Sequence, residues 1–150
     1  MATAHHFEGR LSWRAGGEGI KAGNHQMVFA DRPPLELASA PQYRGDPSRL
    51  SPEDLFVAAL ASCQMLSFLA LAGRAGITVL AYDDHAVGTL AIADKKMRMT
   101  EVVLRPRITL APGADAGKAL ALVHSAHEIC FIANSVACAV NIEPEIVTAA

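Results

Sequence analysis

The sequence has few charged residues, few aromatic residues and no block of basic ones. Charged residues make up 19% and aromatic residues 5% of the 150 residues, and the formal net charge is −2. Because no cluster of lysines and arginines is present, we expect no nucleic-acid partner. Hydrophobic residues reach 51%, which is high for a soluble domain, and such an excess is often buried in a subunit interface. We therefore expect at least a dimer.

Cysteine is also scarce, with three residues in the chain. An odd number of cysteines does not indicate the disulfide framework of a small secreted protein. The first residues, MATAHHFEGRLSW, lack a basic start followed by an apolar run, so we expect no signal peptide. The cytoplasm is then the expected compartment, where thiols stay reduced unless they are catalytic or redox-sensing.

One apolar run, residues 55–72 (LFVAALASCQMLSFLALA), is nearly long enough to span a membrane. Ser62, Gln64 and Ser67 interrupt the run, and no positively charged flank marks a cytoplasmic side. We interpret the run as a helix that is apolar on all sides and buried in a soluble core. The sequence therefore predicts no membrane association.

The order of predicted elements is strands, helix, two strands, helix and strand. This order indicates a single α+β domain over residues 1–150, with a mostly antiparallel sheet and two long helices. No glycine-rich phosphate loop follows a predicted strand, so we expect no nucleotide cofactor. The predicted strands are residues 6–15, 26–31, 77–92, 97–110 and 138–147, with a hairpin at ADKK, and the second helix covers about residues 114–129.

The first long helix has a clear start. Ser51 is a favourable N-cap, Pro52 suits the first helical position, and Asp54 is placed to complete a capping box. Glu53 adds a second carboxylate at the positive end of the helix dipole. Glycines at 73 and 76 predict where the helix ends.

Cys63 lies in the middle of this apolar helix, three turns from its start. Apolar surroundings raise the pKa of a thiol, and the helix dipole does not reach this far, so a nucleophilic Cys63 needs a nearby cation. An arginine would serve, and a desolvated arginine needs a carboxylate to orient it. Glu53 lies about 15 Å from Cys63 along the helix axis. It could take part only if the helix bends or starts late, or if it comes from a second subunit.

The stretch RGDPSRLSPEDLFVAALASCQML, followed much later by Cys130 in AHEICFIANSV, resembles the OsmC/Ohr family. This family comprises the osmotically induced and organic hydroperoxide resistance proteins. Its pattern is a loop arginine, Asn- or Ser-Pro-Glu-Glu, a small and apolar helix, and a cysteine ten residues after the first glutamate. A second cysteine ends the second long helix. The resemblance covers essentially the whole chain and implies α+β subunits in an intertwined homodimer, with sites at the subunit interface.

The resemblance also implies a chemistry. Cys63 would be the peroxidatic cysteine, whose thiolate attacks a hydroperoxide and becomes a sulfenic acid. Cys130 would be the resolving cysteine, which condenses with Cys63 to a disulfide. Arg44 would stabilise the thiolate and polarise the peroxide, and Glu53 would orient Arg44. The reductant would be an external dithiol such as a lipoyl-bearing protein, and no metal or other cofactor is implied.

Several assignments stay open at this stage. Branches of the family take the catalytic arginine from different places, so the other candidates beside Arg44 are Arg10, Arg14, Arg32 and Arg49. Asp54 replaces the second glutamate of the family pattern. FIANSV follows the second cysteine where Pro-Val-Ser is commoner. Gln64, His127 and Glu128 are further polar residues that could serve the site or only the packing.

Other interpretations compete with the peroxidase. Cys138 sits in a strand pattern and is interpreted as structural. His124, His127 and Cys130 are spaced like metal ligands, but they supply at most three, so we expect no metal site. The same fold could be a non-enzymatic module that binds small molecules or lipids, or a slow redox sensor. For the peroxidase, the apolar helix and FIANSV predict a preference for organic hydroperoxides over hydrogen peroxide.

Overall fold

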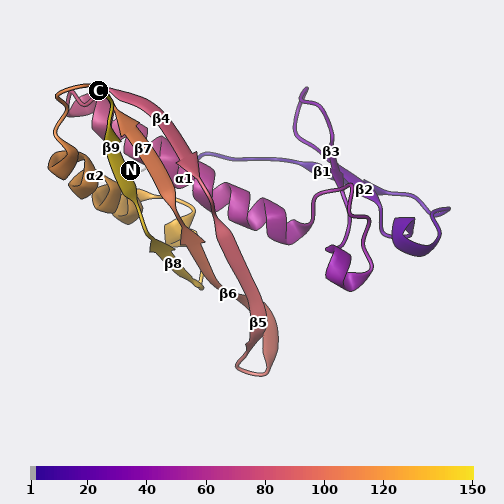
Figure 1. Cartoon of the computed structure of the whole chain (residues 1–150). Helices are drawn as coiled ribbons and strands as arrows, with labels where there is room; N and C mark the ends of the chain where they lie inside the picture. Colours follow the sequence, from indigo (N-terminus) through magenta and orange to yellow (C-terminus); the bar gives the residue numbers. More distant parts are fainter. Residues whose placement is uncertain (1–2) are drawn as a thin grey trace. The chain divides into compact units, whose positions relative to one another are not determined.

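The computed structural model describes residues 3–150, which divide into two compact units (Figure 1). The first unit ends at Leu55 and the second begins at Phe56, so the boundary falls in the first turn of helix α1, Pro52–Arg74. Each unit is described by itself below. A single domain over residues 1–150 stays a prediction.

The first unit is built on a three-stranded antiparallel sheet of order β1-β2-β3. The strands are β1 (Arg10–Trp13), β2 (His25–Val28) and β3 (Leu35–Leu37). The first two confirm the predicted strands in shortened form. The sequence did not predict β3, because three residues are too few to show an alternating pattern. Short 3₁₀ helices, Gly19–Lys21 and Pro41–Tyr43, occupy the connecting loops.

The start of α1 confirms the predicted capping box. The backbone N–H of Asp54 donates to Oγ of Ser51 at 3.1 Å, and the backbone N–H of Ser51 donates to Oδ2 of Asp54 at 2.7 Å. The hydroxyl of Ser51 also donates to the same carboxylate oxygen at 2.8 Å. These reciprocal bonds satisfy the first free N–H groups of the helix and fix where it begins.

The body of α1 is buried on one face in the second unit. Leu60, Gln64, Phe68 and Ala72 recur every fourth residue and are buried, as a helix with one core-facing stripe requires. By length and composition alone α1 could also cross a membrane, although this face packs on the rest of the unit. The predicted burial on all sides is wrong within one chain, since Leu66 on the opposite face is 59% exposed.

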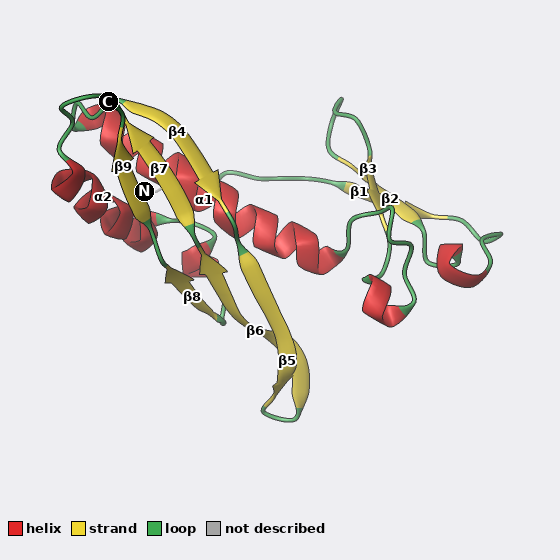
Figure 2. Cartoon of the chain, in the orientation of Figure 1, coloured by secondary structure: helices red, strands yellow, loops and turns green. Residues whose placement is uncertain are grey.

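The second unit contains two three-stranded sheets, of orders β4-β7-β9 and β5-β6-β8 (Figure 2). The pairs β4/β7 and β5/β6 are antiparallel, whereas β6/β8 and β7/β9 are parallel, so both sheets are mixed. The α+β class is confirmed, with antiparallel pairs outnumbering parallel ones. The strands are β4 (Val79–Asp84), β5 (Val87–Ala93), β6 (Lys96–Leu104), β7 (Pro106–Leu110), β8 (Ala139–Ile142) and β9 (Glu145–Thr148).

Each of the three long strands predicted here is broken into two. Two of the breaks adjoin Pro106 and Pro144, which have no N–H to donate to a sheet. The backbone N–H of Arg105 donates to the Asp84 carboxylate at 2.7 Å, and Nε of Arg105 donates to Glu143, also at 2.7 Å. The breaks therefore lie side by side, where the chain passes from one sheet to the other.

Helix α2, Ala116–Ile129, confirms the second predicted helix. Its N-cap Asp115 accepts the backbone N–H of Lys118 at 2.9 Å. Ala119, Val123 and Ala126 are buried on one stripe and pack in the same cluster as Phe68 of α1. The core thus ties the middle of α1 to α2.

Candidate functional site

Cys63 and Cys130 come together in the second unit although 67 positions separate them in the sequence. Cys63 lies in the middle of α1 and is half-buried, whereas Cys130 is the C-cap of α2 and is 1% exposed. Their side chains are close enough that each shifts the pKa of the other, and both are free thiols. An outside reactant would therefore meet Cys63 first.

Hydrogen bonds polarise the Cys63 thiol. Burial alone would raise its pKa, but donors around the sulfur outweigh burial and lower the pKa. The largest of these contributions comes from the backbone N–H of Ile132, followed by the Cys130 thiol, the backbone N–H of Phe131 and the Ser67 hydroxyl. The thiolate of Cys63 is thereby stabilised without a side-chain cation from the second unit.

The pKa of the Cys130 thiol is shifted in the opposite direction. Burial raises the pKa of its thiol, and the neighbouring Cys63 raises it further, while the backbone N–H of Ala133 lowers it in part. That N–H donates to the sulfur of Cys130 at 3.5 Å. The pair is thus unsymmetrical: the pKa of the accessible thiol is lowered and the pKa of the buried thiol is raised.

The segment after α2 is shaped to supply these donors. The backbone N–H of Asn134 donates to the Cys130 carbonyl at 3.0 Å, and the Ser135 hydroxyl donates to the Phe131 carbonyl at 2.7 Å. The chain closes into a turn that ends in the 3₁₀ helix Ala133–Ser135. The segment FIANSV, residues 131–136, therefore has a defined local structure, although it departs from the Pro-Val-Ser that is commoner after the second cysteine.

An apolar cavity of about 550 Å³ opens beside Cys63. Its volume lies in the range of small-molecule sites. One wall is a face of α1 and the other is the end of α2 with the segment after it. The lining residues are Ala59, Ser62, Cys63, Leu66, Ser67, Ala70, Arg74, Ile129, Phe131 and Ile132.

Of the other polar candidates, Gln64 links the two helices, whereas Nδ1 of His127 is buried without a hydrogen-bond partner among the described residues. Nε2 of Gln64 donates to the Val123 carbonyl at 3.0 Å, which links α1 to α2 within one chain. The carbonyl of His127 accepts the N–H of Cys130, and that of Glu128 accepts Nδ2 of Asn134 at 2.9 Å. Neither His127 nor Glu128 is among the residues that line the cavity.

A metal cluster at the end of α2 is not formed. Within residues 3–150 no group of three or more His, Cys, Asp or Glu side chains is placed to hold a metal ion. The spacing of His124, His127 and Cys130 therefore does not bring their side chains together as a ligand set.

The candidate arginines belong to the first unit, and most of them have local partners there. Arg49 contacts Glu36 at 2.6 Å, Arg10 contacts Glu8 at 3.8 Å, and Arg14 donates to the Trp13 carbonyl at 2.9 Å. Arg44 is exposed and has a left-handed backbone (φ 59°). Within residues 3–150, neither Arg44 nor Arg32 forms an ion pair.

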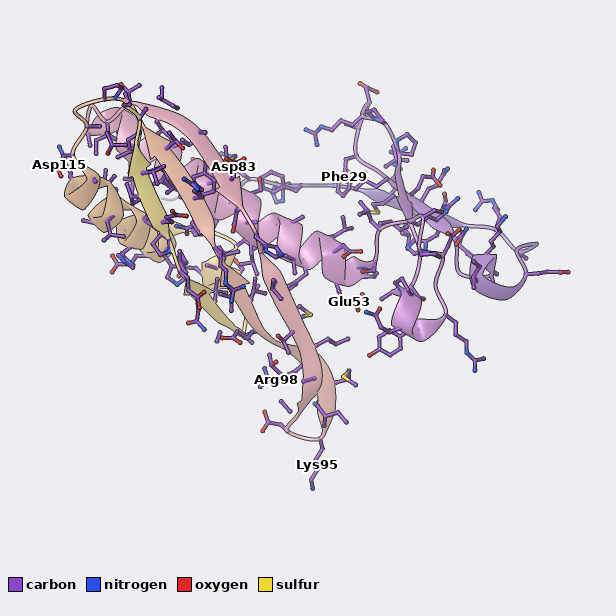
Figure 3. The ribbon with its side chains drawn as sticks, in the orientation of Figure 1. Phe29, Glu53, Asp83, Lys95, Arg98 and Asp115 are labelled. Carbon is purple, nitrogen blue, oxygen red and sulfur yellow. The ribbon has the colours of Figure 1, made fainter. Side chains whose placement is uncertain are left out.

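The predicted orienting carboxylate, Glu53, lies in the first turn of α1 (Figure 3). It is half-buried and has no ion pair within the described part of the chain. Cys63 follows on the same continuous helix, so the separation of about 15 Å along the axis stands. Direct contact between Glu53 and Cys63 of one chain is therefore excluded.

Sequence reasoning missed the donors around Cys63. Backbone N–H groups of residues 131 and 132 leave no mark in the sequence, because any residue except proline provides one. Ser67 could have been found, since it lies one turn after Cys63 on the same helix face.

We expect Ser67→Ala to raise the pKa of the Cys63 thiol, because the variant loses a donor to the thiolate. Below that pKa, alkylation of Cys63 by iodoacetamide should be about threefold slower than in the wild type. At high pH the two rates should converge, since both thiols are then ionised. Ser62→Ala is the matched control, because Ser62 lines the same cavity without bonding to Cys63. Identical pH profiles for Ser67→Ala and the wild type would show that the hydroxyl is not a donor.

Comparisons with known proteins show the fold and the family of the chain. The family model for OsmC-like protein matches residues 45–145. An OsmC-like protein of unknown function from Vibrio cholerae O1 biovar eltor is 31% identical, with a TM-score of 0.86 over 94% of this chain and 99% of its own. No curated protein sequence matches the chain.

Two further solved structures share the fold at lower identity. An organic hydroperoxide resistance protein from Elizabethkingia anophelis is 18% identical, with a TM-score of 0.75 over 99% of this chain and 100% of its own. One from Legionella pneumophila, also described as a predicted redox protein, is 20% identical, with a TM-score of 0.70 over 97% and 99%. Because the family model matches more than half of the chain, the chain belongs to the OsmC-like protein family.

Proposed function

We propose that the protein is a thiol-dependent peroxidase that reduces organic hydroperoxides through Cys63 and Cys130. The observation that carries this proposal is the unsymmetrical cysteine pair, with a lowered pKa at the accessible Cys63 and a raised pKa at the buried Cys130. Two proteins of the same fold are described as organic hydroperoxide resistance proteins, which supports the same chemistry.

The proposed reaction has two steps. The Cys63 thiolate attacks the terminal oxygen of the hydroperoxide, the O–O bond breaks, and the leaving alkoxide takes a proton to become an alcohol. Cys63 is then a sulfenic acid. The sulfur of Cys130 attacks it, a disulfide forms, and the sulfenic oxygen leaves with two protons as water. An external dithiol, such as that of a lipoyl protein, reduces the disulfide, so the cycle needs no metal or flavin.

The cavity supports organic substrates over hydrogen peroxide. Leu66, Ile129 and Phe131 line it beside Cys63, so an alkyl or aryl group would be removed from water there. Hydrogen peroxide has no apolar surface to bury and gains nothing from these contacts. In this proposal Arg44 polarises the peroxide and Glu53 orients Arg44, as the family resemblance implies.

Apolar exposure supports a homodimer, and the cytoplasm stays the compartment that we propose from the sequence. In one chain Phe131 is 81% exposed, and Leu66 and Leu69 of α1 are also exposed. The first unit exposes Leu11 and Trp13 as well. Large apolar side chains in such numbers are typical of surfaces that a second subunit covers. A second copy would also supply the Glu53 that one straight helix cannot bring to Cys63.

The proposal is tested by the products of one turnover. After one equivalent of cumene hydroperoxide, the reduced wild type should lose two hydrogen atoms in intact mass and two of its three free thiols. Cys130→Ser should instead gain one oxygen or more at Cys63, because no resolving thiol is present. Cys138→Ser should behave like the wild type.

The same experiment separates the competing functions. A wild type that keeps three free thiols and its original mass would overturn the peroxidase and favour a binding module with incidental cysteines. A wild type that forms the disulfide but does not turn over cumene hydroperoxide with dithiothreitol or a lipoyl dithiol would favour a redox sensor.

A further inference from the structure

Several side chains of the second unit bury a polar atom that has no hydrogen-bond partner among the described residues. Among these atoms are Oη of Tyr82, Oδ2 of Asp84 and Nδ1 of His127. An unpaired buried donor or acceptor costs free energy, and buried polar atoms in native proteins are nearly always paired with protein or water. Exceptions often have a catalytic or redox role. These atoms therefore indicate a function that the packing alone does not require.

Tyr82 and Asp84 point to the same face of strand β4. Successive side chains of a strand alternate between its two faces, and these two are half-buried while Asp83 between them is exposed. Tyr82 lies against Phe68 of α1, with the ring centroids 6.0 Å apart, and packs in the cluster that includes Ala126 of α2. The inward face of β4 is therefore covered by the same two helices that carry the cysteine pair.

Cys130 lies close to the Tyr82 hydroxyl. It follows Ala126 by four residues, so it continues the buried stripe of α2 by one turn, and it is itself buried. Burial raises the pKa of the Tyr82 phenol, and the carboxylate of Asp84 and the thiol of Cys130 raise it further. The hydroxyl therefore keeps its proton at neutral pH and has both groups as neighbours.

Cys130 has to lose a proton when it attacks the sulfur of Cys63. Burial raises the pKa of its thiol, so little thiolate forms at neutral pH, and bulk water does not reach the sulfur to act as the base. Asp84 can act as that base. Burial raises the pKa of its carboxyl group, which makes the carboxylate a better proton acceptor than an exposed one. Its Oδ1 accepts the N–H of Arg105 at 2.7 Å, whereas Oδ2 has no partner within the described residues.

We propose that Tyr82 and Asp84 form a proton relay that activates Cys130. As the sulfur of Cys130 bonds to the sulfur of Cys63, its proton passes to Oη of Tyr82, and the proton of the phenol passes to Oδ2 of Asp84. The S–O bond of the sulfenic acid breaks, its oxygen leaves as hydroxide and takes a proton from solvent, and Asp84 returns its proton to solvent. Where Oη does not touch a group directly, a buried water carries the proton, and the unpaired atoms are the polar partners that such a water needs. The inference rests on the proposed function for the sulfenic acid only.

An aromatic disulfide, dithiobis(nitrobenzoate), tests the relay without a peroxide. In protein that carries Cys138→Ser, Cys63 displaces one thionitrobenzoate ion, and the attack of Cys130 on the mixed disulfide then releases a second ion and a proton. Tyr82→Phe keeps the ring and loses only the hydroxyl. It should slow the second release at least about tenfold at neutral pH and leave the first within about twofold, because general-base assistance typically contributes about a hundredfold or more and water replaces part of it. A second release that is indifferent to Tyr82→Phe would overturn the proposal.

Asp84→Asn should slow the second release in the same way, although asparagine keeps an acceptor for the backbone N–H of Arg105. The variant with both changes should be no slower than the slower single variant, since each change interrupts the same path. Asp83→Asn is the matched control, because Asp83 (Figure 3) is the exposed neighbour on the same strand, and both releases should stay within about twofold. A tenfold loss in His127→Gln with an unaffected Asp84→Asn would assign the proton to His127 and overturn the relay.

The pH dependence separates the relay from a packing defect. Above the raised pKa of Cys130 the thiol ionises without help, so Tyr82→Phe and the wild type should converge, whereas a displaced Cys130 would stay slow at every pH. Below the pKa of Asp84 the wild type should lose its advantage, because a protonated carboxyl group accepts no proton. The other ionisable groups that face these residues are the same in both proteins: Cys63, His127, His85 and Arg105.

Cumene hydroperoxide separates this inference from the proposed function. Tyr82→Phe should form the Cys63 sulfenic acid at the wild-type rate and close the disulfide more slowly, so dimedone should trap more of the sulfenic acid. A second release that depends on Tyr82, in a protein that does not react with the hydroperoxide, would retain the relay and overturn the peroxidase. Disulfide formation by the hydroperoxide at a rate that does not depend on Tyr82 would do the reverse.

Discussion

Cys63→Ser should abolish hydroperoxide reduction, lowering kcat/KM for cumene hydroperoxide by at least about a thousandfold. A serine hydroxyl stays protonated near neutral pH and has no sulfur to carry the sulfenic acid, so both chemical steps are lost. The donors around this position would remain in place, but they would have no thiolate to stabilise. The measurement is loss of hydroperoxide over time with dithiothreitol or a lipoyl dithiol as reductant.

The control for this variant is Cys138→Ser. Cys138 precedes β8 and packs against the cluster of Leu60, Val102 and Leu104, away from the lining of the cavity. Its replacement should leave kcat/KM within about twofold of the wild type, because it removes a thiol without touching the reactive pair. Undiminished activity in Cys63→Ser, or a loss in Cys138→Ser equal to that in Cys63→Ser, would contradict the assignment of Cys63.

The elements that sequence predicted well are those fixed by local chemistry. The start of α1 follows from Ser51 and Asp54, whose side chains bond to each other's backbone within one turn. The hairpin at ADKK follows from Asp94 and Lys95, which both take the left-handed backbone of a two-residue turn. Such signals need no partner from a distant part of the chain, so they are legible in the sequence.

The features that sequence missed depend on distant partners. The breaks in the long strands are aligned by Arg105, which bonds to Asp84 at the end of β4 and to Glu143 between β8 and β9. The exposed face of α1 has the same composition as its buried face, so the hydrophobic pattern alone does not tell which face the chain itself covers. The donors to Cys63 come from the backbone after α2, which only the packing of the two helices brings there.

The candidates for the catalytic arginine differ in the partners that their side chains have. Arg49 lies between Glu36 at 2.6 Å and Asp46 at 3.9 Å, and its Nη1 also donates to the His25 carbonyl at 3.3 Å. Such an arginine holds the first unit together, and moving it to a substrate would leave two carboxylates unpaired. Arg44 has no such partner within residues 3–150, and it lies in the loop before α1, one of the two places from which branches of the family take the catalytic arginine.

Arg44→Ala should therefore lower kcat/KM for cumene hydroperoxide about a hundredfold, with the fold unchanged by circular dichroism. The expected size is that of removing one donor that stabilises charge developing in a transition state. Cys63 should still be alkylated by iodoacetamide, because the backbone N–H groups of Ile132 and Phe131 keep its pKa low.

Arg32→Ala is the matched control, since Arg32 is also without an ion pair in the described residues, and its activity should stay within about twofold. A hundredfold loss in Arg32→Ala with an active Arg44→Ala would move the role to Arg32. Full activity in both would mean that the polarised cysteine pair reduces the peroxide without an arginine from the first unit.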